Sequence, residues 1–224
     1  MANKIGWCTD TINSITGCLN NCPYCYARKF ATRHAGRFGY PQDDPFRPTF
    51  HPDKLQRIYN LHGAGKRVFL DSMGDWFSEG VDQAWVEATV AAVKAKPNHT
   101  FLVLTKCPEN MPILEPLANL WVGVSINTQA DIDRIGYLRI HYAGKKFVSI
   151  EPLQGPIDSD FKGIDWVIIG AESGNRKGKI TPKPFWVESI LAKCKKTPVF
   201  MKDNLMPYLE GIYCQSEELP REMR

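Results

Sequence analysis

The stretch TFLVLTK (100–106) places a run of apolar and β-branched residues directly before a lysine. A short run of this kind, without strict alternation, is typical of a strand that is covered on both faces of a sheet. Similar runs recur along the chain, at 67–71, 120–126, 146–151, 165–170 and 198–202, with a weaker one at 11–16. The sequence therefore predicts six or seven buried strands.

Amphipathic segments separate several of these runs. The clearest is 81–96, where Trp85, Val86, Val90 and Val93 fall near one helical face. Further helices are expected at 52–61, 128–140 and 184–196, the last after a proline that suits a helix start. Alternating strands and helices indicate parallel βαβ units.

The fold class expected from this order is α/β, as a partial (β/α)6-type TIM barrel of parallel strands with helices outside. A doubly wound open sheet is the alternative. We expect one domain over residues 1–213 and a polar C-terminal tail, 214–224, that frays or extends the sheet edge. The Pro- and Gly-rich stretch 36–52 is expected to be a loop.

Composition narrows the class of protein. Hydrophobic residues make up 43% of the 224 residues, and no apolar run approaches the ~18 residues of a membrane span. The first residues lack a signal peptide's apolar stretch, so we expect a cytoplasmic protein with reduced thiols. Seven cysteines, an odd number, fit a metal-binding or reduced set better than a disulfide framework. The formal charge of +4 permits an anionic partner without requiring one.

Polar residues follow most of the predicted strands. In a parallel sheet these positions meet at one edge, where such folds place their chemistry. Each residue taken alone also suits a turn or a helix N-cap. The residues concerned are Gly17, Cys18, Asp71, Ser72, Met73, Gly74, Asp75, Thr105, Lys106, Ser125, Asn127, Ser149, Glu151, Glu172, Ser173, Lys202 and Asp203.

The stretch CLNNCPYCYARKF (18–30) carries three cysteines, Cys18, Cys22 and Cys25, just before a predicted helix. Clustered thiolates bind a soft metal centre. An iron–sulfur cubane held by three cysteines, with one iron open to another ligand, uses the motif as it stands. Zinc or a four-cysteine cluster would need a distant fourth ligand, because Cys8, Cys107, Cys194 and Cys214 are dispersed and the nearest following histidine is His34. Three unconnected buried thiols are the remaining alternative.

The C-x3-C-x2-C spacing, with Tyr24 before the last cysteine, resembles the signature of the radical S-adenosylmethionine (radical SAM) superfamily. Further blocks are similar to its poorly characterised three-cysteine-motif branch, which is frequent in phages: SITGCLNNCPYCYA, PTFHPDKL, VFLDSMGDWF, HTFLVLTKCPENM, LWVGVSI, FVSIEPL and DWVIIGAESG. Together these blocks cover most of the chain.

The resemblance implies that Cys18, Cys22 and Cys25 hold three irons of a 4Fe–4S cluster, while S-adenosylmethionine chelates the fourth. Reductive cleavage of the cosubstrate would then give a 5′-deoxyadenosyl radical that abstracts hydrogen from a substrate. An external one-electron donor is implied, and the small chain leaves room for a partner protein. If the gene is of phage origin, the compartment is the host cytoplasm.

The same resemblance implies cosubstrate roles at several strand ends. Ser72, Met73, Gly74 and Asp75 occupy the place of a Gly-Gly-Glu-like segment that binds the cosubstrate amine, although the residues differ from that pattern. Ile168, Gly170 and Glu172 resemble a segment that supports the adenine. Lys106 is a candidate for the cosubstrate carboxylate or for the substrate, and Glu151 for the ribose hydroxyls or the substrate. For each of these, a turn, a surface lysine or a structural buried acid is the plainer alternative.

The substrate is predicted only by class. Basic residues between Arg28 and Arg57 alternate with aromatic ones, and Arg176, Lys177 and Lys179 lie in a later loop, which suits a nucleic acid or nucleotide. A solvated charged face is the plain alternative. A metal-stabilised (zinc or structural iron–sulfur) nucleic-acid-binding protein without radical chemistry is the non-enzymatic alternative.

Overall fold

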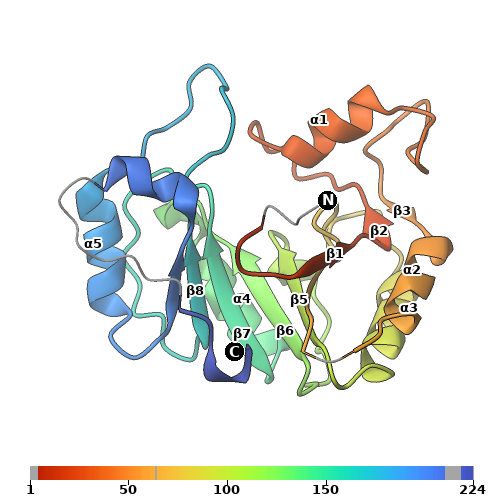
Figure 1. The fold of residues 1–224 in the computed structure, drawn as a ribbon. Helices are drawn as coiled ribbons and strands as arrows, with labels where there is room; N and C mark the ends of the chain where they lie inside the picture. The colour runs from red at the N-terminus through yellow and green to blue at the C-terminus, as the bar shows by residue number, and fades with distance from the viewer. Residues whose placement is uncertain (1–4, 64, 210–217, 224) are drawn as a thin grey trace.

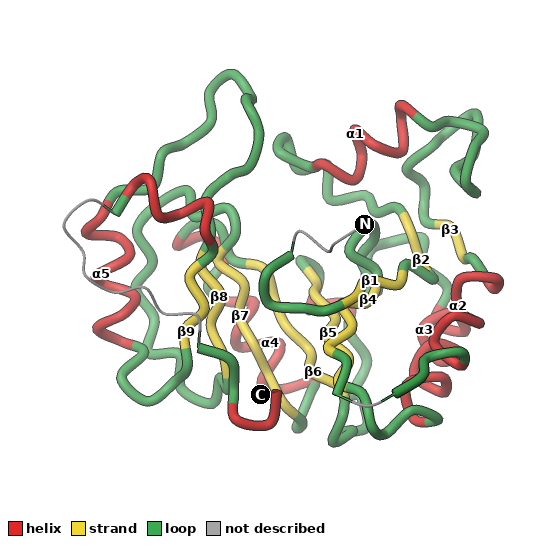
Figure 2. The backbone as a smooth tube through the Cα atoms, viewed as in Figure 1, coloured by secondary structure: helices red, strands yellow, loops and turns green. Residues whose placement is uncertain are grey.

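The computed structural model describes residues 5–63, 65–209 and 218–223. Within them, seven parallel strands form one curved sheet in the order β1-β4-β5-β6-β7-β8-β9. Figure 2 shows these strands as an arc that runs from β9 at one end to β1 at the other. Their bounds are β1 Asp10–Ile12, β4 Arg67–Leu70, β5 Thr100–Thr105, β6 Leu120–Ser125, β7 Lys145–Ile150, β8 Trp166–Ile169 and β9 Val199–Met201. The expected partial barrel of parallel strands is confirmed.

Four longer helices lie outside this arc (Figure 1): α2 (Pro52–Tyr59), α3 (Gln83–Lys94), α4 (Asp133–His141) and α5 (Pro184–Lys193). Local sequence sets where they begin. The Asp82 carboxylate accepts the Ala84 N–H at the start of α3, and prolines open α2 and α5. The predicted helix 128–140 is divided into the short 3₁₀ turn η2 (Gln129–Asp131), which begins with a capping box of Thr128 and Asp131, and α4.

The helical coat is less regular than a repeated βα unit. The connection from β5 to β6 contains the 3₁₀ turn η1 (Pro108–Asn110), and the described connection from β7 to β8 contains no helix. Nevertheless, β5 and β6 are paired at five positions, and β7 and β8 at four. The sheet, rather than the number of helices, therefore defines the half-barrel.

Alternate residues of the strands fill two different cores. The helix-covered face buries β-branched and aliphatic residues such as Val68, Val103, Val122, Val148 and Val167. The concave face buries mainly aromatic residues: Trp7, Phe69, Trp121, Phe147, Trp166 and Phe200. Because successive strand residues point to opposite faces, this explains why the strands read as continuous apolar runs.

The aromatic core of the concave face is closed by residues from both ends of the described chain. Met223, in the 3₁₀ turn η4 (Arg221–Met223), is 4% exposed and packs in the same cluster as Trp7. The Arg67 guanidinium donates to the carbonyls of Trp7 and Met223, and the Trp166 indole donates to that of Glu218. These contacts fasten residues 218–223 to the sheet; the rest of the predicted tail lies outside the described residues.

The predicted single strand at 11–16 is wrong in one respect. Residues 10–12 join the main sheet as β1, whereas β2 (Ile15–Thr16) pairs antiparallel with β3 (Thr49–Phe50), inside the expected loop 36–52. The break falls at Asn13 and Ser14, whose side chains bond to the segment after β4 instead. This turn directs the following chain across the carboxyl edge of the sheet.

The helix α1 (Tyr26–Arg33) lies above that edge, and Figure 1 shows the long loop between β8 and α5 rising on the opposite side of the mouth. A further 3₁₀ segment, η3 (Asp203–Tyr208), follows β9. None of the helices in the described ranges is long and apolar enough to span a bilayer.

Candidate metal and cofactor site

The cysteine loop, residues 18–25, is held on the carboxyl edge by backbone contacts at both ends. The Gly17 N–H donates to the Met73 carbonyl at 2.9 Å, and the Cys18 N–H to the Phe46 carbonyl at 3.2 Å. Gly17 has φ +85°, and a Cβ there would meet the Arg47 carbonyl oxygen at 2.2 Å, so only glycine fits. At the other end, the Cys25 sulfur accepts the Arg28 N–H and caps α1.

The three thiols of this loop are near neighbours. Burial raises the pKa of Cys18 to about 11, and the charges of Asp75, Cys25 and Cys22 add to this effect. In the described part of the chain, no three His, Cys, Asp or Glu side chains are already gathered tightly enough to hold a single metal ion. Cys18, Cys22 and Cys25 therefore form a half-buried set of soft donors that would have to lose their protons on binding a metal.

Two cationic side chains flank the thiols. The Arg28 guanidinium donates to the Cys18 carbonyl at 3.2 Å, and its buried Nε has no hydrogen-bond partner among the described residues. Burial lowers the pKa of Lys106, while the nearby Cys22 opposes that shift. A cluster bound through three thiolates is anionic, so these cations and the unsatisfied donor fit such a group.

The segment Ser72-Met73-Gly74-Asp75 lies directly against the cysteine loop. Gly74 forms a parallel bridge with Gly17, and a Cβ on Gly74 would meet the Ile15 carbonyl oxygen at 2.8 Å. Met73, Cys18 and Cys25 pack against the same small cluster, which contains Tyr40 and Phe46. The Ser72 hydroxyl donates to Asn13, and its carbonyl accepts from the Tyr26 hydroxyl. The structure thus brings this predicted segment next to the predicted metal ligands.

Asp75 is buried and fully occupied by hydrogen bonds. Its carboxylate accepts from the Thr105 hydroxyl at 2.6 Å, the Lys106 N–H at 2.8 Å, the Asn20 amide at 3.0 Å and the Phe77 N–H at 3.2 Å. These donors come from the cysteine loop, from the end of β5 and from its own turn. The carboxylate therefore joins three segments of the site, and burial nevertheless raises its pKa.

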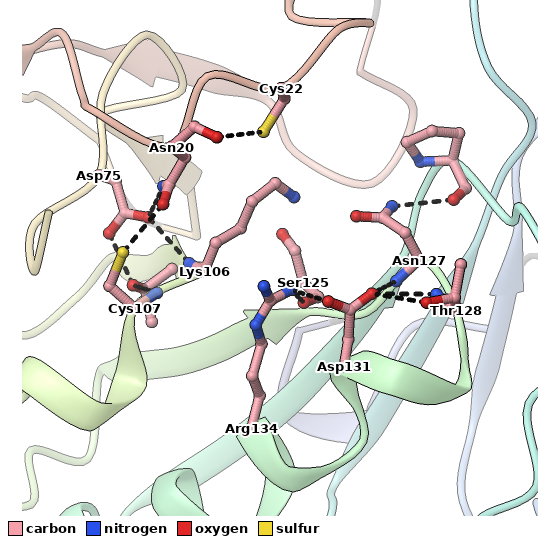
Figure 3. A network of polar contacts seen from close by, with 12 residues as sticks. Asn20, Cys22, Asp75, Lys106, Cys107, Ser125, Asn127, Thr128, Asp131 and Arg134 are labelled. Atoms are coloured by element: carbon pink, nitrogen blue, oxygen red, sulfur yellow. Dashed lines mark hydrogen bonds and ion pairs between the residues drawn. The ribbon is translucent and has the colours of Figure 1, made fainter.

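A polar network on the other side of the mouth was not anticipated as a site from the sequence (Figure 3). The Tyr24 hydroxyl donates to Asn127 Oδ1 at 2.6 Å, and Asn127 Nδ2 donates to the Pro152 carbonyl at 2.8 Å. The Asp131 carboxylate accepts the Asn127 and Thr128 N–H groups and pairs with Arg134 at 2.9 Å. This chain of contacts ties the cysteine loop to the ends of β6 and β7.

Tyr24 is therefore an anchor of the loop as well as a neighbour of Cys25. Burial, followed by the nearby Cys22, raises its pKa, so its hydroxyl keeps the proton that it donates. The Lys106 ammonium lies 5.8 Å from the centre of the Tyr24 ring, which places a cation over an aromatic face. The sequence placed Asn127 at this edge because it follows a strand, and the capping pattern at Thr128 and Asp131 is a second local signal for the network.

The remaining predicted residues form a second group, at the ends of β7, β8 and β9. Glu151 pairs with Lys202, both largely buried. Gly170 lies between them, and a Cβ there would meet the Lys202 side chain at 3.0 Å and that of Glu151 at 3.2 Å. Glycine at position 170 thus makes room for this ion pair.

Glu172 forms an ion pair with Arg176, four residues further along the chain. It is 3% exposed and accepts two hydrogen bonds from the Arg176 guanidinium, at 2.7 and 2.8 Å. Those bonds lower its pKa. Arg176 belongs to the long loop between β8 and α5, so the pair fixes the base of that loop.

The structure therefore divides the predicted site residues into two sets along one edge of the sheet. Cys18, Cys22, Tyr24, Cys25, Ser72, Met73, Gly74, Asp75 and Lys106 gather on the β4–β5 side, while Glu151, Gly170 and Glu172 lie on the β7–β9 side. Asn20, Asn127, Asp131 and Arg134 complete the network. Cys107 is also buried here, and its thiol donates to Asn20 at 3.0 Å. Burial, with the nearby charges of Asp75 and Glu109, raises the pKa of Cys107 to about 12.

The fold is similar to that of spore photoproduct lyase. A variant of that enzyme gives a TM-score of 0.53 at 14% identity over 88% of this chain and 64% of the other. A complex with dinucleoside spore photoproduct gives 0.51 at 14% identity over 88% and 64%. A third structure, with bound AdoMet and the dinucleoside, gives 0.50 at 14% identity over 84% and 61%.

At this identity the likeness concerns the fold alone, and this chain spans less than two thirds of the length of the lyase chains. No curated protein sequence matches significantly. Residues 2–204 match the family described as "Protein of unknown function (DUF5131)". Since that match extends over most of its length, the chain belongs to the DUF5131 family.

Proposed function

We propose that this protein is a radical SAM enzyme whose 4Fe–4S cluster is held by Cys18, Cys22 and Cys25. The observation that supports this most is the position of the three thiols on a loop across the carboxyl edge of a parallel half-barrel, between Arg28 and Lys106. Active sites of barrel folds lie at this edge. Spore photoproduct lyase, which shares the fold, is a radical SAM enzyme.

The three cysteines would hold the cluster, and the bound groups would supply the chemistry, a one-electron reductive cleavage of S-adenosylmethionine. The protein's own residues position and shield these groups. The Gly17 and Cys25 contacts fix the loop, and Lys106 and Arg28 offset negative charge. The aromatic core fills the interior of the half-barrel on its concave face.

The cosubstrate roles follow from position. Ser72, Met73 and Gly74 lie next to the cysteine loop, to which Gly74 is bridged at Gly17, so they are our candidates for the amine. Asp75 keeps this segment in place through four hydrogen bonds. Its carboxylate charge would act on the cosubstrate amine from a buried position. Lys106 and Tyr24 border the position proposed for the carboxylate. Glu151, Gly170 and Glu172 are proposed for the nucleoside side.

The substrate proposed is a nucleic acid or nucleotide. Two of the structures described above as similar in fold contain a dinucleoside spore photoproduct, which is a nucleic-acid lesion. The enzyme would depend on an external one-electron donor and could act with a partner protein. Its proposed setting is the cytoplasm, in a phage-type modification system.

The test is anaerobic reconstitution with iron and sulfide, followed by reduction with and without S-adenosylmethionine. We expect an EPR signal that changes when the cosubstrate is added, together with formation of 5′-deoxyadenosine. Cys22→Ala should lose both the cluster and the product. Cys194→Ala, which removes a buried thiol at the C-cap of the distant helix α5, should keep both.

The alternative is a metal-stabilised nucleic-acid-binding protein without radical chemistry. Bound zinc, or a cluster whose EPR spectrum is indifferent to S-adenosylmethionine, would favour it. Such a result would overturn the radical proposal but leave the position of the metal at the cysteine loop intact.

A further inference from the structure

Two adjoining rows of side chains occupy the outer surface of α1 and the turn that follows it. Tyr26, Phe30, His34 and Phe38 recur every four residues, and three of them are well exposed, at 59% for Tyr26, 42% for Phe30 and 67% for Phe38. The rings of Phe30 and His34 are stacked with centroids 4.2 Å apart, and those of His34 and Phe38 lie 5.4 Å apart. We call these four residues the aromatic row.

The second row, Lys29, Arg33 and Arg37, has the same four-residue spacing and lies exposed beside the first. None of its members forms an ion pair within residues 5–63, 65–209 and 218–223. Residues 11–42 contain no Asp or Glu and four basic residues, Arg28 and the three of this row. No acidic residue of this segment therefore offsets its positive charge.

Not all of the basic and aromatic residues between positions 28 and 57 belong to this surface. Tyr40 and Phe46 are buried, Phe46 lies under the Arg28 guanidinium, and Phe50 stacks on Trp85. Arg47 pairs with Asp43, and Arg57 approaches Asp10. The exposed surface is therefore formed by α1 and the turn that follows it, which are only part of the longer basic and aromatic stretch.

We propose that the aromatic row and the basic row form a platform for single-stranded nucleic acid, with bases on the rings and phosphates on the cations. Rings that are exposed in a row can stack on successive unpaired bases, and neighbouring unpaired cations match the backbone charge. A duplex keeps its bases stacked inside and offers these rings nothing. An acidic protein would use the cations and leave the rings without a partner.

The platform leads to the candidate site. Cys25 caps the first turn of α1, and the Tyr26 hydroxyl, at the head of the aromatic row, donates to the Ser72 carbonyl at 2.7 Å. A strand lying along the row would therefore reach the mouth of the half-barrel beside the cysteine loop. This part of the inference rests on the proposed function, whereas strand binding itself does not.

The test uses anaerobically reconstituted full-length protein and fluorescence anisotropy with a fluorescein-labelled 20-nucleotide DNA, an RNA of the same sequence, and the duplex DNA. Phe38→Ala, at the most exposed ring, and Phe30→Ala/Phe38→Ala should each weaken single-strand binding, the double variant by roughly tenfold or more. Lys29→Gln/Arg33→Gln/Arg37→Gln should weaken binding and reduce the slope of log affinity against log salt by about two. Circular dichroism checks that each variant is folded.

A matched control comes from the other side of the molecule. Phe185→Ala/Lys195→Gln/Lys196→Gln removes one exposed ring and two exposed cations from α5 and the residues just after it, and should leave the affinity unchanged. Equal weakening by this control, or equal affinity for duplex and single strand, would overturn the platform. The platform would also be overturned if poly-glutamate displaced the nucleic acid completely and the aromatic variants bound it as the parent does.

The outcomes separate this inference from the radical proposal. If S-adenosylmethionine is cleaved but the α1 variants bind as the parent does, the platform is wrong and the enzyme class stands. If the platform variants lose binding in a protein that holds only zinc, the platform stands and the radical chemistry is wrong.

Discussion

At the residue scale, Gly74 is a position of the site where the neighbouring backbone leaves no room for a side chain. It lies against the backbone of Ile15 and Thr16, at the place where the segment after β4 meets the cysteine loop. A resemblance to a Gly-Gly-Glu-like segment suggests a ligand role for this glycine. The structure gives an additional reason for it, which is the close approach of two backbone segments.

Gly74→Ala should destabilise the protein by about 1–3 kcal/mol and reduce iron loading, because the new Cβ would overlap the Ile15 carbonyl. Urea unfolding and iron content after reconstitution would measure the two effects. Gly136→Ala is the control: nothing lies within 4 Å of its Cβ in α4, so helix propensity should make it neutral or stabilising by up to about 1 kcal/mol. A Gly74→Ala protein as stable as the parent would contradict the predicted overlap.

Asp71 is a strand-end acid with a structural task. It is 3% exposed and accepts hydrogen bonds from the Ile15 N–H, the Ser14 hydroxyl and the Trp76 indole, which holds β2 beside the end of β4. Burial outweighs those bonds and raises its pKa to about 7. Its position after a strand did not distinguish it from Asp75.

The raised pKa of Asp71 predicts a pH effect on stability. Between about pH 4 and pH 7 the folded state binds a proton at Asp71 that the unfolded state has released, so this contribution falls as pH rises. The full loss would be at most about 4 kcal/mol. His51 acts oppositely, because burial lowers its pKa to about 4 and its contribution is lost as pH falls. The urea unfolding free energy of Asp71→Asn relative to the parent should therefore rise across this range; a constant difference would contradict the prediction.

At the scale of elements, the site is assembled where connections cross the sheet edge. The cysteine loop belongs to the β2–α1 connection, Asp75 to the β4–α3 connection and Asn127 to the β6–α4 connection. Asp75 and Asn127 follow the parallel strands β4 and β6, and the antiparallel pair β2–β3 carries the cysteine loop to the same edge. Local capping fixes each loop separately, and the side-chain bonds between loops fix them relative to one another.

The contact between Tyr24 and Asn127 should be energetically coupled. Tyr24→Phe removes the hydroxyl, and Asn127→Ala also frees the Pro152 carbonyl. A double-mutant cycle on the urea unfolding free energy should give a coupling of about 0.5–1.5 kcal/mol. Additive single effects would mean that this bond does not hold the loop to β6.

At the scale of the molecule, residues near both ends of the described chain cover the half-barrel. The concave face of seven strands carries large rings, and a half-barrel leaves them open on one side. Trp7 and residues 218–223 cover this opening at the amino ends of the strands, while the carboxyl ends remain available for the site.

Met223→Ala should therefore cost about 2–4 kcal/mol of stability, because a buried side chain would leave a cavity among the rings. Glu222→Ala is the neighbouring control: its ion pair with Lys145, at 3.0 Å, is exposed on both sides and should contribute less than about 1 kcal/mol. Thermal unfolding measures both. Similar losses in the two variants would mean that the tail is held by its surface contacts.

The sequence by itself determined the elements. The six strong apolar runs are the six strands β4 to β9, and the helices 52–61, 81–96 and 184–196 are present with ends trimmed by a few residues. The parallel order and the edge that carries the polar residues follow from the same pattern, because strand burial, helix periodicity and turn residues are local properties. The three cysteines and the 72–75 segment were recognised as neighbours for this reason.

Only the tertiary structure decided which side chains are free to act. Asp75 looks like an available acid in the sequence, but donors from the cysteine loop and from the end of β5 already occupy it. The bond of Tyr24 to Asn127 spans 103 residues, and the exposure of Phe38 and burial of Phe46 differ although both lie in one basic stretch. Such facts depend on contacts between distant segments, which no local pattern contains.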